Sequence, residues 1–183
     1  MTAAEDDELL DLVDTNDQVV GTILRRDTGK SGTMPKGRYI RGASCFIMNS
    51  KHQLWIPRRT LHKKIAPGGL DYSVGGHVTS GETYEEALVH EFAEEVNIHI
   101  ATSELIFIGK ETPALIPSHY YFSKVYIYLS DKTPQYNPDD FTGYEWLTAS
   151  ELRAKLLAGE PAKESLLLAT DFVLAYLGQD QRN

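Results

Sequence analysis

Three glutamates on one predicted helix are the residues of this sequence best suited to chemistry. Glu91, Glu94 and Glu95 are spaced so that their carboxylates share one face of an α-helix within two turns. Like charges at this spacing repel one another by roughly 0.2–0.5 kcal/mol per pair. A divalent cation would remove that cost, and Mg²⁺ prefers hard oxygen ligands together with water and phosphate. Taken alone, the pattern is more typical of a solvated acidic helix face, and a metal site that polarises a phosphate is the alternative.

The helix that must position these side chains is marked at both ends. Thr83 and Glu86 form a Thr-x-x-Glu capping box, which is typical of a helix start. Asn97 is suited to the left-handed position that ends a helix. We therefore expect a helix over 83–96. An adjoining stripe suited to packing on a sheet is formed by Leu88, Val89, Phe92 and Val96.

The rest of the chain alternates between β-forming runs and helices. Two apolar runs around Asp-Thr-Asn-Asp, 9–13 and 19–23, predict an N-terminal hairpin, and a loop rich in Gly, Ser and Lys follows over 27–37. Strands with interspersed helices predict an α/β fold, with a mixed sheet and helices packed on its faces. Further strands are expected over 39–48, 54–57, 70–74, 105–108, 120–129 and 144–147, and further helices over 150–157 and 162–177.

Length and composition favour one domain with an added arm. The chain has 183 residues, is 42% hydrophobic and carries a net charge of −8. We divide it into an acidic arm with hairpin and linker (1–36), a main domain (37–177) and a tail (178–183). The acidic balance disfavours a nucleic-acid polymer as partner, and no apolar run is long enough to span a membrane. A single cysteine, Cys45, and the lack of a leader pattern predict a cytoplasmic protein.

Basic residues are concentrated in one segment. Between Arg25 and Lys64, eleven lysines and arginines stand against one acid, Asp27. This asymmetry suits a small anionic ligand better than a polymer, although exposed solvated turns explain it equally well. Arg58 and Arg59 follow a predicted strand, so alternation would direct one toward a substrate phosphate and the other toward solvent, without deciding which.

The spacing around the three glutamates resembles the Nudix box, G-x5-E-x7-R-E-U-x-E-E-x-G-U, where U is an apolar residue. Two positions depart from it: His90 stands where the family has arginine, and Asn97 where it has glycine. Asn97 is a mild change because both residues tolerate the left-handed conformation. Histidine is fully cationic only at lower pH, so weaker or more pH-dependent activity would follow from His90. The matching positions are Gly76, Glu82, Glu91, Phe92, Glu94, Glu95 and Ile98.

The resemblance implies a Nudix-type α/β/α sandwich, preceded here by the N-terminal hairpin. It also implies a metal-dependent pyrophosphohydrolase that uses Mg²⁺ or Mn²⁺. The expected substrate is a nucleoside diphosphate derivative or a nucleoside di- or triphosphate. The alternative, motivated by His90, is a non-catalytic module of the same fold that binds a nucleotide or a partner protein. The hairpin can pack on its own domain or on a second subunit, which leaves a homodimer open.

The resemblance further assigns roles within the box. Glu91, Glu94 and Glu95 would bind the metal, with help from the Gly76 carbonyl. Glu91 or Glu94 would orient or deprotonate the attacking water. In some relatives the base lies in a later loop, where the candidates here are Asp139, Asp140 and Glu145.

Five residues outside this set have supporting parts. Glu82 and His90 would support the glutamates without binding the metal. His77, beside the box, is a weak candidate for contact with metal-bound water or substrate, and Arg58 and Arg59 are weak candidates for contact with substrate phosphate.

The hairpin and the segment 54–59 look like the Nudix branch close to isopentenyl-diphosphate isomerases. Those isomerases carry a catalytic cysteine immediately before the Gly-His of this loop, where this sequence has Gly75. Cys45, the only thiol, lies in a predicted strand. The strand with the isomerases' second acid/base glutamate matches 118–125, which contains no carboxylate. We therefore expect hydrolysis rather than isomerisation.

Overall fold

A computed structural model describes residues 7–28, 34–116 and 120–180 of the chain. The predicted acidic arm, the loop over 27–37, the segment 118–125 and the tail over 178–183 therefore lie partly outside the described residues. Within the described residues, no helix has both the length and the apolar character needed to cross a membrane.

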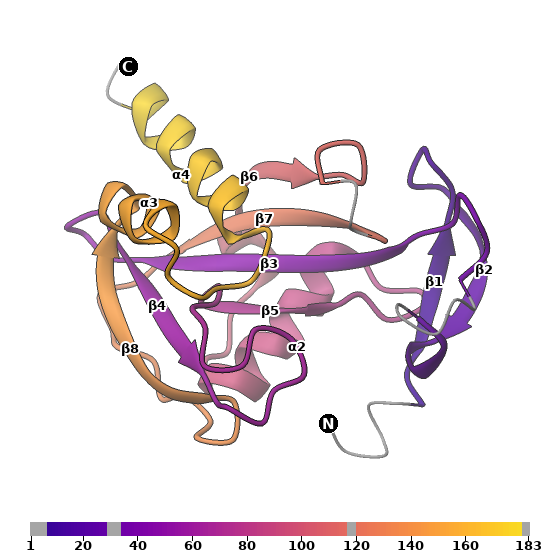
Figure 1. The fold of residues 1–183 in the computed structure, drawn as a ribbon, viewed down its shortest axis with the longest axis horizontal. Helices are drawn as coiled ribbons and strands as arrows, with labels where there is room; N and C mark the ends of the chain where they lie inside the picture. The colour runs from indigo at the N-terminus through magenta and orange to yellow at the C-terminus, as the bar shows by residue number, and fades with distance from the viewer. Residues whose placement is uncertain (1–6, 29–33, 117–119, 181–183) are drawn as a thin grey trace.

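A six-stranded mixed sheet forms the centre of the molecule (Figure 1). β3 pairs in parallel with β7 on one edge. Its other edge is shared by two antiparallel strands, β5 along positions 42–45 and β4 at Met48. β6 continues the sheet beyond β7, and β8 continues it beyond β4. The strands are β3 (Ile40–Met48), β4 (Gln53–Arg59), β5 (Val74–His77), β6 (Ile106–Glu111), β7 (Tyr121–Leu129) and β8 (Phe141–Thr148).

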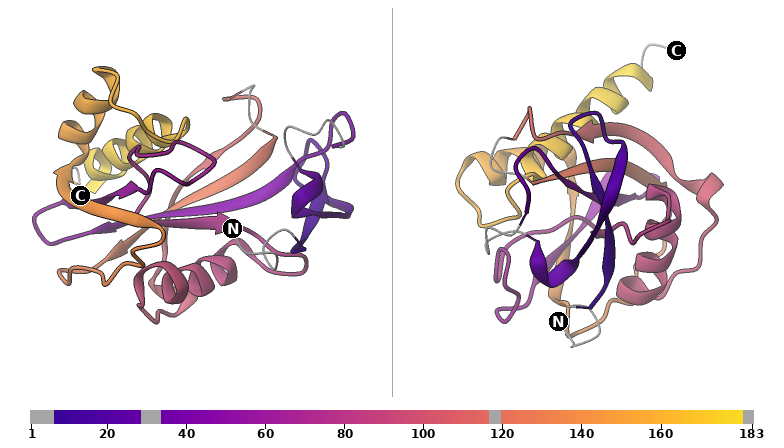
Figure 2. Two further views of the ribbon diagram at one scale, coloured as in Figure 1. Left: turned by 60° about the horizontal axis from the view of Figure 1, so that its bottom comes forward. Right: turned by 90° about the vertical axis from the view of Figure 1, so that its right-hand side faces the viewer.

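Helices cover both faces of this sheet (Figure 2). α2 (Tyr84–Val96) covers one face, and α3 (Ala149–Leu157) and α4 (Leu166–Asp180) cover the other. Two short 3₁₀ helices, η1 (Arg25–Asp27) and η2 (Thr102–Glu104), complete the helical segments of the described chain. This arrangement confirms the predicted α/β/α sandwich.

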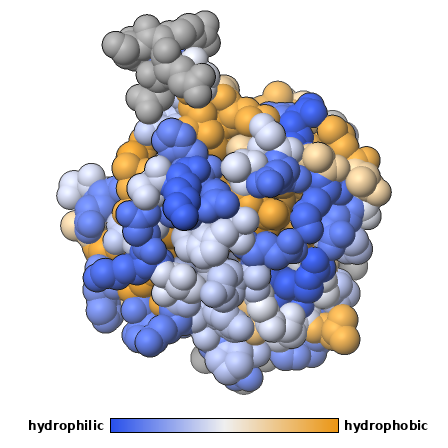
Figure 3. Space-filling view, turned by 90° about the vertical axis from the view of Figure 1, so that its left-hand side faces the viewer, coloured by the Kyte–Doolittle hydropathy of each residue, from blue (hydrophilic) through white to orange (hydrophobic). Residues whose placement is uncertain are grey.

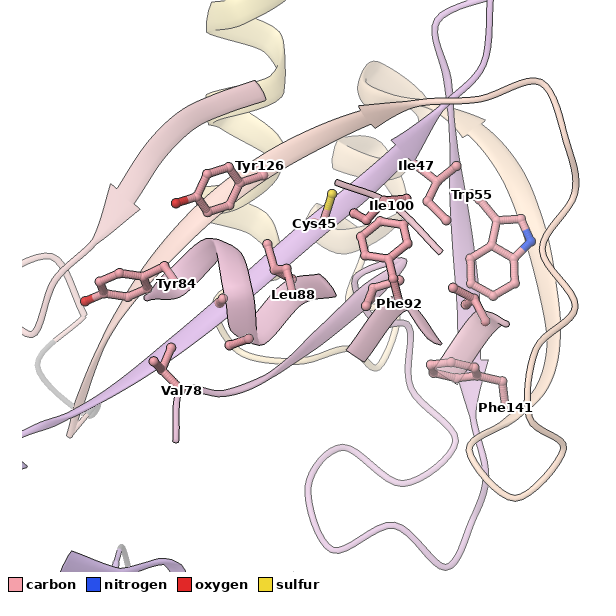
Figure 4. Packing of buried hydrophobic residues seen from close by; sticks show 14 residues of the cluster. Cys45, Ile47, Trp55, Val78, Tyr84, Leu88, Phe92, Ile100, Tyr126 and Phe141 are labelled. Atoms are coloured by element: carbon pink, nitrogen blue, oxygen red, sulfur yellow. The ribbon is translucent and has the colours of Figure 1, made fainter. Parts of the chain in front are cut away.

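Each helical layer has its own hydrophobic core. Under α2, the fully buried Leu88 and Phe92 pack with Cys45 of β3 and with Tyr126 of β7 (Figure 4). The core on the other face joins the sheet to α3 and α4. On the face shown in Figure 3, hydrophilic side chains surround smaller hydrophobic areas, which is ordinary for the surface of a folded domain.

Both ends of α2 follow the sequence prediction. The Thr83 hydroxyl accepts a hydrogen bond from the Glu86 N–H at 3.2 Å, and the Glu86 carboxylate accepts one from the Thr83 N–H at 2.9 Å. Asn97 ends the helix in the left-handed conformation, with φ of 53°. The capping interactions therefore fix both ends of the helix that carries the three glutamates.

Two element predictions are wrong, and they have a common cause. The sequence predicts a strand over 70–74 and a helix from 162, whereas β5 begins at Val74 and α4 at Leu166. The backbones of Leu70 and Lys163 bond each other instead, with the Lys163 N–H donating to the Leu70 carbonyl at 3.0 Å. Because of this pairing between distant segments, β5 and α4 each begin four residues later than predicted. A local sequence pattern cannot indicate such a pairing.

The N-terminal hairpin packs on its own domain. β1 (Leu9–Val13) and β2 (Val19–Leu24) pair antiparallel, as predicted. Asp17, in the turn between them, accepts hydrogen bonds from Arg41 Nε at 2.6 Å and from the Tyr84 hydroxyl at 2.8 Å. Lys110 of β6 also pairs with this carboxylate. One buried carboxylate thus ties the hairpin to β3, β6 and the start of α2.

A second buried carboxylate, Glu111, ends β6. Its Oε1 accepts a hydrogen bond from the Tyr72 hydroxyl at 2.8 Å, and the Ser165 hydroxyl lies 2.7 Å from the same Tyr72 oxygen. Among the described residues, Oε2 of Glu111 has no partner. Burial raises the pKa of Glu111 to about 7.

Glu111→Gln should make the free energy of unfolding less dependent on pH. Because the folded pKa of about 7 exceeds the ordinary 4.5, the folded state retains a proton that the unfolded chain loses between these values. Stability therefore falls as pH rises through this window, by about 3 kcal/mol for such a shift. Urea unfolding at about pH 5 and about pH 8 measures it.

Glu104→Gln, at an exposed glutamate, is the control and should keep the wild-type pH dependence. Equal pH dependence in Glu111→Gln and the wild type would contradict this account of Glu111.

Candidate active site

The glutamates of α2 face the two glycines of β5. An added Cβ at Gly76 would lie 1.7 Å from Oε1 of Glu91, so glycine alone leaves room for this carboxylate. Glu95 Oε2 accepts a hydrogen bond from the Gly75 N–H at 3.1 Å. The strand therefore fixes two carboxylates, one by close packing and one by a hydrogen bond.

The carboxylates lie near enough to influence each other. Burial raises the pKa of Glu91 to about 7, with the charge of Glu94 as the next cause. Burial raises the pKa of Glu95 well above its ordinary value, and the charge of Glu91 adds to it. Glu94 is exposed. Glu91 and Glu95 thus lie close enough to disfavour each other's ionisation, and the exposed Glu94 adds to the effect on Glu91.

The donor chemistry fits a hard divalent cation. In the part of the chain that the structure describes, no three His, Cys, Asp or Glu side chains converge closely enough to hold an ion as they stand. Mg²⁺ is commonly held by one or two carboxylates, with water and phosphate completing its octahedron. Glu91 and Glu95 supply such carboxylates, and a cation would offset the burial and the mutual repulsion that raise their pKa values.

His90 contacts Glu82 in the turn between β5 and α2, not the three glutamates. Its Nδ1 lies 2.8 Å from Oε1 of Glu82, and 65% of its side chain is exposed. Glu82 in turn accepts hydrogen bonds from the N–H and the hydroxyl of Thr79. His90 and Glu82 therefore brace the turn between β5 and α2.

His77 is the last residue of β5, and its imidazole is buried. Its Nδ1 is buried without a partner among the described residues. Burial lowers the pKa of His77 to about 3, and the charges of Arg25 and Lys163 contribute to the decrease. The imidazole is therefore neutral at neutral pH, with one ring nitrogen free to bond water or a ligand.

Arg58 and Arg59 are the last two residues of β4 and are engaged elsewhere. Arg58 donates to the Glu160 carboxylate at 2.7 Å, and Arg59 pairs with the buried Asp71. Each guanidinium also donates to a backbone carbonyl. The two arginines have different acceptors, and a register shift between them interrupts the strand alternation on which the prediction was based. Among the described residues, neither forms an ion pair with the α2 glutamates.

The later-loop acids differ in their surroundings. Asp140 pairs with Lys63, and Glu145 accepts a hydrogen bond from Lys155 at 2.8 Å. Asp139 is exposed, and within the described chain its carboxylate has no ion pair. Asp139 and Asp140 lie in the segment before β8, whereas Glu145 lies within β8 and not in a loop as predicted. The segment before β8 reaches α2, because the Asn137 N–H donates to the Glu95 carbonyl at 2.9 Å.

Sequence reasoning missed two cations near the glutamates. The charges of Arg25 and Lys163 act on both Glu91 and His77. Arg25 belongs to the basic segment that the sequence singles out, so that signal was present. Lys163 lies far outside the segment, and only the pairing of its backbone with Leu70 brings it here.

Comparisons with known proteins point to one family. The NUDIX domain family matches residues 38–169. A Nudix hydrolase of Deinococcus radiodurans is 44% identical over 160 residues, which are 87% of this chain and 90% of that protein. A crystal structure from Deinococcus radiodurans has a TM-score of 0.76 and 43% identity, and covers 90% of this chain and 98% of its own.

The isomerase-like branch is also found among the relatives. Isopentenyl-diphosphate Delta-isomerase 2 of Photorhabdus laumondii is 30% identical over 152 residues, which are 81% of each protein. The matches confirm the predicted enzyme class, a hydrolase acting on acid anhydrides in phosphorus-containing substrates. The domain match and these relatives together show that the chain belongs to the Nudix hydrolase superfamily.

Proposed function

We propose that this protein hydrolyses a phosphoanhydride bond of a nucleoside diphosphate derivative or of a nucleoside di- or triphosphate, with Mg²⁺ or Mn²⁺ as cofactor. The observation that carries the proposal is the packing of the Glu91 carboxylate on Gly76, which excludes any side chain at that position. The relative named Nudix hydrolase, 44% identical to this chain, supports the reaction class.

Glu91, Glu94 and Glu95 would hold the ion, with the Gly76 carbonyl assisting. Once bound, the ion polarises the phosphate and lowers the pKa of a bound water. Glu91 and Glu95 are held by β5, so they keep their places before substrate arrives. Glu94 is exposed and is free to orient the attacking water, and Glu91 or Glu94 accepts its proton on a carboxylate oxygen.

The remaining candidates have smaller parts. The neutral His77 offers its unpartnered Nδ1 to a water or a substrate oxygen. Arg58 and Arg59 would have to release internal acceptors before binding a phosphate. His90 and Glu82 stabilise the turn between β5 and α2.

Two other functions have specific observations for or against them. A non-catalytic binding module is favoured by the weaker, exposed pairing of His90 with Glu82 where the family has arginine. Isomerisation is opposed by Gly75 at the position of the isomerase cysteine and by Cys45, which is buried in the core under α2.

Glu94→Gln should lower turnover by roughly a hundredfold or more, because it removes one carboxylate from the set that acts on metal and water. Product release from a panel of nucleotides, with and without Mg²⁺, measures this. Glu86→Gln is the matched control on the same helix, since glutamine preserves the capping box. Metal-independent turnover, or full activity in Glu94→Gln, would count against the proposal.

Gly76→Ala should lower turnover to a similar extent, because the added methyl group occupies the place of Oε1 of Glu91. Gly143→Ala, where a Cβ would meet nothing within 4 Å, is the control and should remain active. Turnover and the unfolding temperature are measured for both. A folded Gly76→Ala protein with normal turnover would show that the position of Glu91 is unimportant.

His90→Arg should change turnover by less than about fivefold, because His90 forms an exposed pair with Glu82 and contacts none of the proposed metal ligands. Steady-state rates of both proteins across pH test this. A wild type that binds nucleotide without turnover, together with activity gained in His90→Arg, would instead establish the non-catalytic module.

A further inference from the structure

Two cations from distant parts of the chain flank the segment that contains Gly75 and Gly76. Lys163 precedes α4, and Arg25 lies in η1 after the N-terminal hairpin. Both side chains are about three-quarters buried, with 25% of each exposed. Each is fixed by backbone pairing and by a neighbouring acid, so neither is an unrestrained surface charge.

Lys163 is fixed on the side where the chain enters β5. Its N–H donates to the Leu70 carbonyl at 3.0 Å, and its Nζ lies 3.0 Å from the Asp71 carboxylate. The ammonium also lies 5.7 Å from the centre of the Tyr72 ring. The run from Leu70 to Tyr72 leads directly into β5, so Lys163 stands beside the strand that positions Glu91.

Arg25 is fixed on the side where the chain leaves β5. Its N–H donates to the Glu8 carbonyl at 2.8 Å, and its guanidinium lies 3.0 Å from the Glu8 carboxylate. The next residue, Leu9, accepts a hydrogen bond from the Ser80 N–H at 2.8 Å. This bonding holds the hairpin, and Arg25 with it, against the turn that follows His77.

Internal partners leave an excess positive charge on the Lys163 side, whereas Glu8 matches the charge of Arg25. Asp71 is a single carboxylate between two cations, Arg59 and Lys163, so that group has an excess positive charge. Among the described residues, neither Arg25 nor Lys163 forms an ion pair with Glu91 or Glu95. The cations are therefore fixed on the segments before and after β5 without being paired to these carboxylates.

We propose that Arg25 and Lys163 form a two-sided clamp that binds the phosphate groups of the substrate opposite the glutamates of α2. This inference rests on the proposed function and deepens it, because it places the diphosphate between the hairpin and the segment before α4. An anion at this position gains a charge-assisted hydrogen bond from each side. The competing explanation is that each cation serves only as the structural counter-ion of Glu8 or Asp71.

Binding of methylenediphosphonate, a pyrophosphate analogue that resists hydrolysis, tests the clamp. Isothermal titration calorimetry is performed with and without Mg²⁺ on the wild type, Arg25→Gln and Lys163→Met. Each substitution should weaken binding by roughly tenfold or more, the loss expected for one hydrogen bond to a charged group. Unfolding temperatures confirm that both variants are folded, and Asp71 keeps Arg59 when Lys163 is replaced.

Matched controls come from neighbouring ion pairs. Arg26 lies beside Arg25 in η1, and Arg26→Gln breaks its ion pair with Asp7. Arg153→Gln breaks the ion pair that joins Arg153 of α3 to Asp171 of α4. Both should bind the analogue within about twofold of the wild type. Arg25→Lys and Lys163→Arg should retain most of the affinity, because they keep the charge.

Glu8→Gln separates the clamp from the structural explanation. It breaks the same ion pair as Arg25→Gln but leaves the guanidinium in place. The clamp predicts that Glu8→Gln binds the analogue as well as the wild type or better. Equal loss in Glu8→Gln and Arg25→Gln, unchanged binding in Arg25→Gln and Lys163→Met, or no binding by the wild type would each overturn it.

The clamp and the proposed function can fail separately. A wild type that binds the analogue through both cations but turns over no nucleotide would leave the clamp standing and remove the hydrolase. Normal turnover in the wild type, with analogue binding unchanged by both substitutions, would support the hydrolase and remove the clamp.

Discussion

The close approach of the Glu91 carboxylate to Gly76 is the contact on which the rest of the site depends. It requires a residue without a side chain in β5 and a helix held at one distance from that strand. The capping box at Thr83 and the left-handed Asn97 fix the ends of α2, and the apolar stripe with Phe92 fixes its height above the sheet. Packing thus supports a carboxylate arrangement that electrostatics alone would disperse.

The division of one edge of β3 between β4 and β5 gives the site its surroundings. Because β4 meets β3 only at Met48, β5 takes the other half of the edge and brings its glycines beneath α2. The segment before β5 then pairs with residues ahead of α4, and the hairpin bonds to the segment after it. Lys163, from the C-terminal part of the domain, and Arg25, from the N-terminal hairpin, are therefore held on the segments before and after β5.

The buried carboxylates outside the cluster show how these segments are joined. Asp17 is compensated by Arg41 and Lys110, so its burial binds the hairpin firmly to the domain. Glu111 has hydroxyl partners and, within the described part of the chain, one oxygen without a partner, so its burial raises the pKa instead. The same side-chain type is ionised in one place and readily protonated in another because of its partners.

The sequence alone predicted the hairpin, the capped helix and the α/β sandwich, because turn residues, capping and periodicity act over short distances. It also grouped Glu91, Glu94 and Glu95, since a helix converts spacing directly into a shared face. It did not predict that Arg59 would be taken by Asp71, or that Lys163 would stand beside β5. Those positions follow from pairing between residues far apart in the chain, which only the tertiary structure decides.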